Sequence, residues 1–158
     1  GSVSGGRGVH AAGDTVAVWG DSGVALFDLA GRPLGALSLG VGRKPVVAAV
    51  APDGQRIAIV DDGGALHVYD RRGQPVFRVT SGLTGTVLAW GPDGAVVYVG
   101  GAPIRVFRAT DGVETVRFVL SPDGPIEELA VAADGTIAAA QANAESQVLR
   151  RIASGVLD

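Results

Sequence analysis

Gly20-Asp21-Ser22-Gly23 contains the residue types that come nearest to a nucleophilic centre in this sequence. A serine in such a setting attacks a carbonyl carbon only when a histidine general base and a buried aspartate converge on its hydroxyl. The stretch separates two short apolar runs, as a tight turn does, and His10 falls on the strand expected before it. We therefore interpret these four residues as a turn, and we expect no catalytic residue in the chain.

Asp61 and Asp62 are adjacent carboxylates of the kind that bind hard cations. Such a cation requires several oxygen ligands, and two neighbouring carboxylates supply too few, so we expect a solvated turn. His10 and His67 are the only histidines, and their spacing matches no metal-binding pattern, which favours packed or surface side chains. The sequence predicts no metal site and no cofactor.

Gly40-Val41-Gly42-Arg43-Lys44 is glycine-rich and basic, as phosphate-binding loops are. The Gly-Lys-Ser/Thr ending and the following helix of such loops are missing, so we interpret it as a loop between two strands. Trp19 and Trp90 fall on predicted strands, where a large aromatic side chain belongs to the core rather than to a ligand platform.

The elements that position these residues form a repeat of about 40 residues. Asp-Gly turns recur with Asp-to-Asp steps of 40 and 41, at Asp53, Asp93 and Asp134. A second marker is a large apolar residue followed by a charged one, which ends an apolar run in each unit. It recurs at spacings of 42, 38 and 42, as Phe27-Asp28, Tyr69-Asp70, Phe107-Arg108 and Leu149-Arg150. A unit this short cannot bury its own apolar face, so it must stack on copies of itself, as β-propeller blades do.

Each unit is typical of a four-stranded antiparallel meander, because Asp-Gly between apolar runs favours a tight hairpin turn. The strands are predicted at 9–12, 15–19, 24–29 and 34–39; at 45–51, 56–60, 65–69 and 75–80; at 86–90, 96–99, 104–108 and 114–119; and at 126–132, 136–140, 147–152 and a stub at 155–158. Alanine and valine dominate the first strand of the second and fourth units, which fits strands that converge on a central channel. The predicted fold is an all-β propeller of about four blades, or half of an eight-bladed ring.

We expect a single domain whose blades span residues 9–44, 45–85, 86–125 and 126–158, the last with a short outer strand. Residues 1–8 are expected to be a linker or an expression remnant, because Gly1-Ser2 and the absence of methionine indicate a start left by protease cleavage. The parent protein is accordingly expected to be longer. Residues 136–152 are rich in helix formers, but Asp134-Gly135 and Leu149-Arg150 keep the register of the repeat, which favours two strands over one helix.

Composition excludes several partners. The hydrophobic fraction is 47%, yet no apolar run approaches the roughly 20 residues of a membrane span, so no membrane partner is expected. The net charge is −3 and the basic residues are scattered, which argues against nucleic acid. The chain has no cysteine, which fits either a reducing cytosol or an exported protein, and we lean toward the cytoplasm.

The sequence resembles bacterial WD-repeat β-propellers and their WD-like relatives over residues 9–158. The resemblance rests on the period, on Ala51-Pro52-Asp53-Gly54 and Gly91-Pro92-Asp93-Gly94, and on the aromatic-Asp ends Phe27-Asp28 and Tyr69-Asp70. No unit ends in Trp-Asp and no Gly-His dipeptide occurs, so the hydrogen-bonded Asp-His-Ser-Trp set of that family does not carry over. A quinoprotein-like or other bacterial propeller subfamily stays open.

The resemblance implies that the loops between blades and between the second and third strands bind a protein or peptide partner. In this sequence those loops contain the candidate residues Asp21, Ser22, Arg43, Lys44, Asp61, Asp62, Thr84, Pro103 and Asn143. The expected function is a non-catalytic interaction scaffold within a larger protein. Two alternatives stay open: part of a quinoprotein- or lactonase-like enzyme whose active site needs residues outside this chain, or a piece made to study propeller assembly.

Four blades are at the lower limit for a closed ring, since propellers have about four to eight. An open arc leaves two apolar blade faces without a partner, which favours self-association. We therefore expect a homodimer that forms an eight-bladed ring, and further blades in a longer parent or a closed four-bladed ring are the alternatives.

Overall fold

The computed structural model describes residues 5–80, 82–83, 87–119, 126–142, 147–153 and 156–157, with side-chain surroundings up to residue 141. Within these residues, sixteen strands form four antiparallel sheets of four strands each, and every sheet is a meander of consecutive strands. The strands are β1 (Gly6–Ala12), β2 (Thr15–Gly20), β3 (Gly23–Asp28), β4 (Pro33–Leu37), β5 (Pro45–Val50), β6 (Arg56–Asp61), β7 (Ala65–Asp70), β8 (Pro75–Thr80), β9 (Val87–Trp90), β10 (Val96–Gly100), β11 (Ile104–Arg108), β12 (Glu114–Phe118), β13 (Ile126–Val131), β14 (Ile137–Ala142), β15 (Gln147–Ala153) and β16 (Val156–Leu157).

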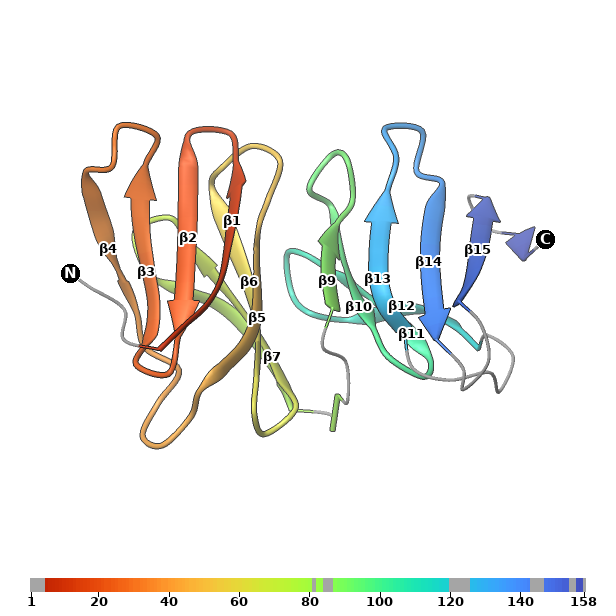
Figure 1. Cartoon of the computed structure of the whole chain (residues 1–158), viewed down its shortest axis with the longest axis horizontal. Coiled ribbons are helices and arrows are strands. Elements are labelled where there is room, and N and C mark those ends of the chain that lie inside the picture. The colour runs from red at the N-terminus through yellow and green to blue at the C-terminus, as the bar shows by residue number, and fades with distance from the viewer. Residues whose placement is uncertain are drawn as a thin grey trace.

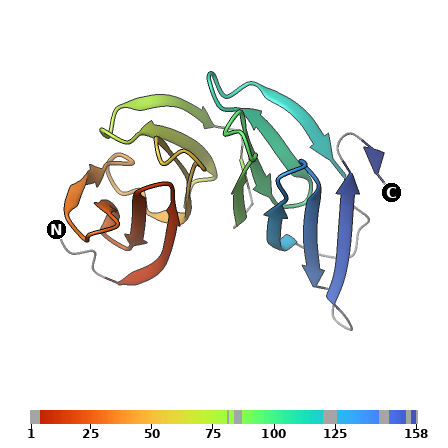
Figure 2. The ribbon, with the colours of Figure 1, turned by 90° about the horizontal axis from the view of Figure 1, so that it is seen from above.

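The four sheets follow one another along an arc, with the first and fourth sheets at its two ends (Figure 2). The first strands of successive sheets lie next to one another, because β1 contacts β5, β5 contacts β9 and β9 contacts β13. These four strands form the inner side of the arc. The fold is therefore an all-β, partial propeller of about four blades, numbered 1 to 4 below in chain order, as the repeat predicted.

Most predicted strands begin and end within two residues of the observed ones. In blade 4, β14 and β15 are strands, so the repeat register prevails there over helix propensity. The start of blade 1 differs, because β1 begins at Gly6 and residues 6–8 belong to the sheet rather than to a linker. Gly8 lies against the Trp19 ring, where a Cβ atom would approach within 2.3 Å of a ring carbon, so the close contact requires glycine.

Each blade has two faces, and we call the one toward the preceding blade its leading face and the other its trailing face. The leading face of blade 2 contributes Ala48, Val50, Ile57, Ile59 and Tyr69 to a cluster with Trp19, Leu26 and Leu37 of blade 1. Its trailing face contributes Ala49, Ala58, Val60, Leu66 and Val68 to a cluster with Trp90, Val97 and Phe107 of blade 3. The core consequently lies between blades, as it must when a four-stranded sheet cannot cover itself.

Trp19 and Trp90 are core residues, with 8% and 7% of their surface exposed, which confirms the prediction. The Trp90 indole N–H donates a hydrogen bond of 2.9 Å to the carbonyl of Ala49 across the junction of blades 2 and 3. Because alanine is small, the inner strand of blade 2 leaves room for this large ring. The guanidinium carbon of Arg56 lies over the Trp90 ring, 5.3 Å from the ring centroid.

The Asp-Gly turns join the first and second strands of their blades, as predicted. Gly54, Gly94 and Gly135 have positive φ angles of 71°, 71° and 82°, which glycine adopts without strain. In blades 1 and 2, the side chain of the first residue of the second strand also makes a hydrogen bond to the Asp-Gly turn of the next blade. Thr15 Oγ1 donates to Gly54 O at 2.9 Å, and Arg56 Nη2 donates to Gly94 O at 2.8 Å. Val96 holds this position in blade 3, and its aliphatic side chain cannot donate.

Candidate interaction face

The loops that carry most of the predicted site residues lie on one flat face of the arc, along the lower edge of Figure 1. They are the loops between the second and third strands of each blade and the loops between blades. We call it the loop face and define it by residues 20–23, 38–44, 61–64 and 100–104. The strands alternate in direction, so every second connection returns to this face.

Charged side chains from three of these loops meet where blade 1 adjoins blade 2. Arg43 Nη1 lies 3.8 Å from Asp62 Oδ1, and Lys44 Nζ lies 3.9 Å from Asp21 Oδ1. Arg7 Nη2 makes a shorter ion pair of 2.6 Å with Asp21 Oδ1. These five residues, the loop-face cluster, keep 42% to 52% of their side-chain surface exposed. Sequence reasoning found four of them but set Arg7 aside with the expected linker.

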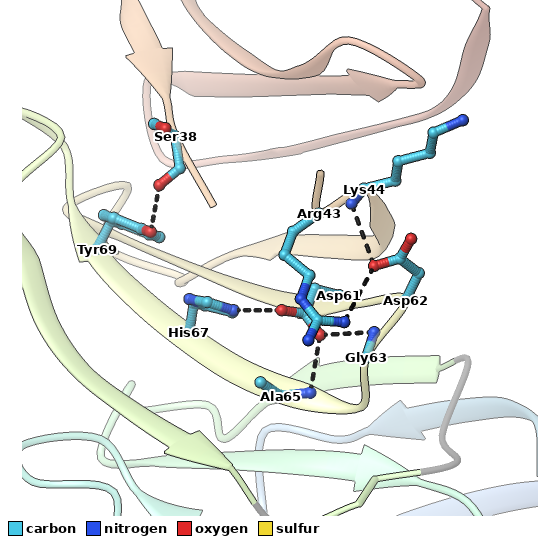
Figure 3. Close-up of polar contacts among 9 residues, drawn as sticks. All are labelled: Ser38, Arg43, Lys44, Asp61, Asp62, Gly63, Ala65, His67 and Tyr69. Carbon is cyan, nitrogen blue, oxygen red and sulfur yellow. Dashed lines mark hydrogen bonds and ion pairs between the residues drawn. The ribbon is translucent and has the colours of Figure 1, made fainter. Parts of the chain in front are cut away.

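The backbone also ties the two loops of the cluster together. The Lys44 N–H donates to Asp62 Oδ1 at 3.3 Å, and the Asp62 N–H donates to the Lys44 carbonyl at 2.9 Å (Figure 3). The Arg43 guanidinium lies so close to Gly63 that a Cβ atom there would stand 1.9 Å from Nη1. The loops are thus held by the main chain, while the long Arg43 and Lys44 side chains extend from them.

Asp21 is held in its charged form by this arrangement. The hydrogen bond and the positive charge of Arg7, and then the charge of Lys44, lower the pKa of the Asp21 carboxyl below its ordinary value. The carboxylate is therefore ionised near neutral pH. The loop-face cluster presents three cations and two anions to solvent near neutral pH.

Asp61 is not part of this exposed surface, and the prediction that both aspartates of the turn are solvated is wrong for it. Asp61 is the last residue of β6 and is 2% exposed, whereas Asp62 is exposed. Its Oδ1 accepts hydrogen bonds of 2.9 Å from the N–H groups of Gly63 and Ala65, and its Oδ2 lies 2.8 Å from His67 Nε2 (Figure 3). The residue shapes the turn from within and is unavailable to a partner.

Burial alone raises the pKa of Asp61, but hydrogen bonds from Ala65, His67 and Gly63 outweigh it and hold that pKa below its ordinary value. His67 is itself buried, as the sequence allowed, and its ring is stacked with the Tyr69 ring at a centroid distance of 6.2 Å. The Tyr69 hydroxyl donates to the Ser38 carbonyl of blade 1 at 2.7 Å. A line of polar groups therefore runs from the turn after β6 to the neighbouring blade.

The remaining predicted residues are placed as follows. Ser22 is exposed in the β2–β3 turn, so the structure supports a turn at Gly20–Gly23. The two histidines make hydrogen bonds to groups other than Ser22, since His67 Nε2 is paired with Asp61 and His10 Nδ1 accepts a hydrogen bond of 3.1 Å from the Val50 N–H. Pro103 is half-buried in the β10–β11 loop. Thr84 and Asn143 lie outside the described residues.

The inner side of the arc is a separate, mostly apolar surface. A cavity of about 350 Å³ is lined by all four inner strands and the turn after β5; its walls are His10, Ala12, Val50, Pro52, Leu88, Ala89, Trp90, Leu129, Ala130 and Val131. Partial burial lowers the pKa of His10, whose ring is neutral when Nδ1 accepts from Val50. In the part of the chain that the structure describes, no three His, Cys, Asp or Glu side chains gather as metal ligands would. No helix long and apolar enough to cross a membrane occurs in that part either.

Four-stranded meander sheets that pack face to face, with their inner strands next to one another, define this chain as a β-propeller protein. It belongs to the family of the lipoprotein LpqB β-propeller domain, whose model matches residues 32–150. Comparison with curated proteins gave no match. The propeller part of the predicted resemblance is confirmed, and its WD-repeat part stays a prediction.

Solved structures with the same arrangement of blades occur in longer chains. The hydrazine synthase of Kuenenia stuttgartiensis superposes with a TM-score of 0.76 at 20% identity, over 92% of this chain and 45% of that one. The Sqt1 protein of Chaetomium thermophilum superposes with a TM-score of 0.68 at 26% identity, over 87% of this chain and 40% of that one. The chain thus spans less than half the length of either, and the likeness to hydrazine synthase concerns the fold alone.

Proposed function

We propose that this domain is a non-catalytic protein-interaction scaffold of a longer protein, and that it binds a protein or peptide on the loop face. The observation that carries the proposal is the loop-face cluster. Exposed side chains from three loops and two blades converge there, on a main chain that hydrogen bonds already hold in place. A backbone that is already ordered lowers the entropic cost of binding.

The ion pairs of the cluster suit an exchange of partners. Arg43 and Lys44 are 3.8 and 3.9 Å from their carboxylates, at the long limit of an ion pair, and all four side chains are half exposed. Pairs of this kind contribute little to stability, at most about 1 kcal/mol, so a partner's carboxylate replaces the internal one at little cost. Arg7 and Asp21 form the tighter pair that stays in place. The expected ligand therefore presents acidic groups to Arg43 and Lys44.

The composition of the inner cavity supports a structural role for the inner side of the arc rather than a catalytic one. Apart from His10, its walls are apolar residues and Trp90, and the His10 imidazole accepts a backbone hydrogen bond. A propeller enzyme of the quinoprotein or lactonase type needs convergent charged groups at this place. The relation to WD-repeat propellers belongs to the same proposal, since the loop face corresponds to that family's usual partner-binding surface.

The test reverses the charge of two residues on the loop face and, separately, of two residues on the opposite flat face of the arc. A partner is first identified by copurification with the parent protein, and its affinity for the domain is then measured at two salt concentrations. Arg43→Glu with Lys44→Glu is expected to weaken binding at least about tenfold and to remove most of the salt dependence, because steering by complementary charge is lost. Arg32→Glu with Arg72→Glu, an equal charge change in turns on that opposite face, is the matched control.

Unchanged affinity in the Arg43 and Lys44 variant, or equal losses in both variants, would overturn the role of the loop face. A partner that is chemically altered by the domain would overturn the non-catalytic assignment instead.

A further inference from the structure

The inner strands of blades 1, 2 and 3 are joined by side-chain hydrogen bonds at one place in the repeat. Register makes His10 equivalent to Ala49 of the next blade, and it makes Val50 equivalent to Trp90. Between blades 1 and 2, the Val50 N–H donates to His10 Nδ1 at 3.1 Å. Between blades 2 and 3, the same two positions are joined by the Trp90 indole, which donates to the Ala49 carbonyl at 2.9 Å.

The two bonds differ because imidazole titrates and indole does not. A neutral imidazole has one nitrogen that accepts and one that donates, whereas a protonated imidazole has two donors and no acceptor. His10 accepts through Nδ1, so the proton of its neutral ring lies on Nε2. A second proton, on Nδ1, points at the Val50 N–H and removes the hydrogen bond. The indole of Trp90 is a donor only, and its bond to Ala49 does not depend on pH in this way.

The backbone of β5 shows why the Val50 N–H depends on His10. The Ala51 N–H donates to the Arg56 carbonyl at 2.8 Å, and successive N–H groups of a strand point to opposite edges. The Val50 N–H therefore points away from β6, toward the edge of the sheet that β1 contacts. Val50 is 1% exposed, and a buried donor that loses its acceptor destabilises the fold.

The surroundings of His10 favour its neutral ring. Its neighbours β2, β5 and β9 contain no charged residue, and the cavity that His10 lines has otherwise apolar walls and Trp90. Burial accordingly lowers the pKa of His10. The ring still keeps part of its surface in solvent, so a proton reaches it without unfolding. The charged residues of β1, β13 and the adjoining turns do not line this cavity; they are Arg7, Asp14, Asp53, Glu127 and Glu128.

We propose that the hydrogen bond between His10 and Val50 is a pH-sensitive link between blades 1 and 2, formed by the neutral imidazole and broken when the imidazole takes up a proton. Because the folded chain favours the neutral ring, the stabilisation is complete above pH 6.5 and decreases as the pH falls toward the lower pKa of the folded state. The loop-face cluster lies where the same two blades adjoin, so acid weakens the junction that carries it.

The first experiment uses the full, unaltered chain. An NMR titration from about pH 8 to about pH 5 follows the ring nitrogens of His10 and the backbone amide of Val50. We expect the neutral ring to carry its proton on Nε2, and we expect the Val50 amide to shift with the same midpoint as the His10 ring, below pH 6.5. A neutral ring protonated on Nδ1, or a Val50 amide that does not follow the His10 titration, overturns the proposal.

The second experiment compares the unaltered chain with His10→Asn and His10→Ala by urea denaturation at the same two pH values. The Asn Oδ1 atom takes the place of Nδ1 as an acceptor but does not titrate. Alanine removes the acceptor and is the residue at this position in the other blades, as Ala49, Ala89 and Ala130. Circular dichroism establishes that each variant is folded.

On going from about pH 8 to about pH 5, the folded-to-unfolded ratio of the unaltered chain is expected to fall about 3- to 10-fold more than that of either variant. At the higher pH, His10→Ala is expected to be less stable than the unaltered chain, and His10→Asn is expected to lie closer to it. The titration of His67 and Glu114 is common to all three proteins and cancels in this comparison. Equal dependence on pH in all three proteins, or a His10→Ala variant as stable as the unaltered chain at the higher pH, overturns the link.

Discussion

His67 Nε2 lies 2.8 Å from Asp61 Oδ2, and both side chains are buried at the junction of blades 1 and 2. The same carboxylate accepts the Gly63 and Ala65 N–H groups, so one side chain satisfies three donors of the turn and the strand after it. A buried donor without an acceptor costs about 1 to 3 kcal/mol. We therefore expect Asp61→Ala to lower the free energy of unfolding by about 2 to 4 kcal/mol, as measured by urea denaturation.

Asp62→Ala is the matched control, because it makes the same change at the adjacent, exposed residue. Its expected cost is below about 1 kcal/mol, since its partners on the loop face keep access to water. Equal costs for the two substitutions would contradict the assignment of Asp61 to the interior.

Glu114 predicts an acid-dependent component of stability. The hydrogen bonds from Arg117 and Arg105 lower the pKa of Glu114 from 4.5 to about 2. Because the pKa is lower in the folded state than in the unfolded one, the stabilisation is complete above pH 4.5 and is lost as the pH falls toward 2. Allowing for partial exposure to solvent, we expect Glu114→Gln to cost about 1 kcal/mol at neutral pH. Urea titrations of both proteins should converge near pH 2, and a difference that stays constant with pH would contradict this account.

Gly63 and Gly64 are adjacent but predict opposite tolerance of alanine. Gly64 has a φ of +73°, and a Cβ atom there would stand 2.7 Å from the Leu83 carbonyl oxygen. We expect Gly64→Ala to destabilise the domain by at least about 2 kcal/mol, from left-handed strain and a backbone clash. Gly63→Ala meets only the end of the Arg43 side chain, which can move, so its cost is expected below about 0.5 kcal/mol. Thermal unfolding of the pair is the measurement, and similar midpoints would contradict it.

Arg56 and Trp90 predict a measurable coupling across the junction of blades 2 and 3. The guanidinium carbon of Arg56 is 5.3 Å from the centroid of the Trp90 ring. In a double-mutant cycle of Arg56→Met and Trp90→Leu, we expect a coupling free energy of about 0.5 to 1 kcal/mol. A second cycle that pairs Arg56→Met with Trp19→Leu, in blade 1, serves as the control and is expected to be additive. Additivity in both cycles would show that the contact contributes nothing.

The sequence was sufficient for the fold because the features that define it are local. An Asp-Gly turn depends on glycine at positive φ, and a strand depends on alternation, so both are visible without knowledge of contacts. The boundary of β1 was missed because Gly6, Arg7 and Gly8 show no alternation. They belong to a strand only because Gly6 and Gly8 pair with Gly20 and Trp19 of β2, with a register shift between them.

The different fates of Asp61 and Asp62 depend on one residue of strand length. The predicted strand ended at Val60, which left both aspartates in the turn. Extending β6 by one residue places Asp61 in phase with Ile57 and Ile59, on the buried leading face. That alternation was present in the sequence and could have found it. The gathering of Asp21, Arg43 and Lys44 at one point could not be found in this way, because it depends on how blade 1 packs on blade 2.

The side chains of Thr15 and Arg56 each donate a hydrogen bond to a turn of the next blade, whereas Val96, at the equivalent position of blade 3, has an aliphatic side chain that cannot donate. Links of unequal strength in a linear array mean that denaturation proceeds stepwise. Val96 supplies no such link to blade 4, so amide exchange is expected to be faster in β13 than in β6.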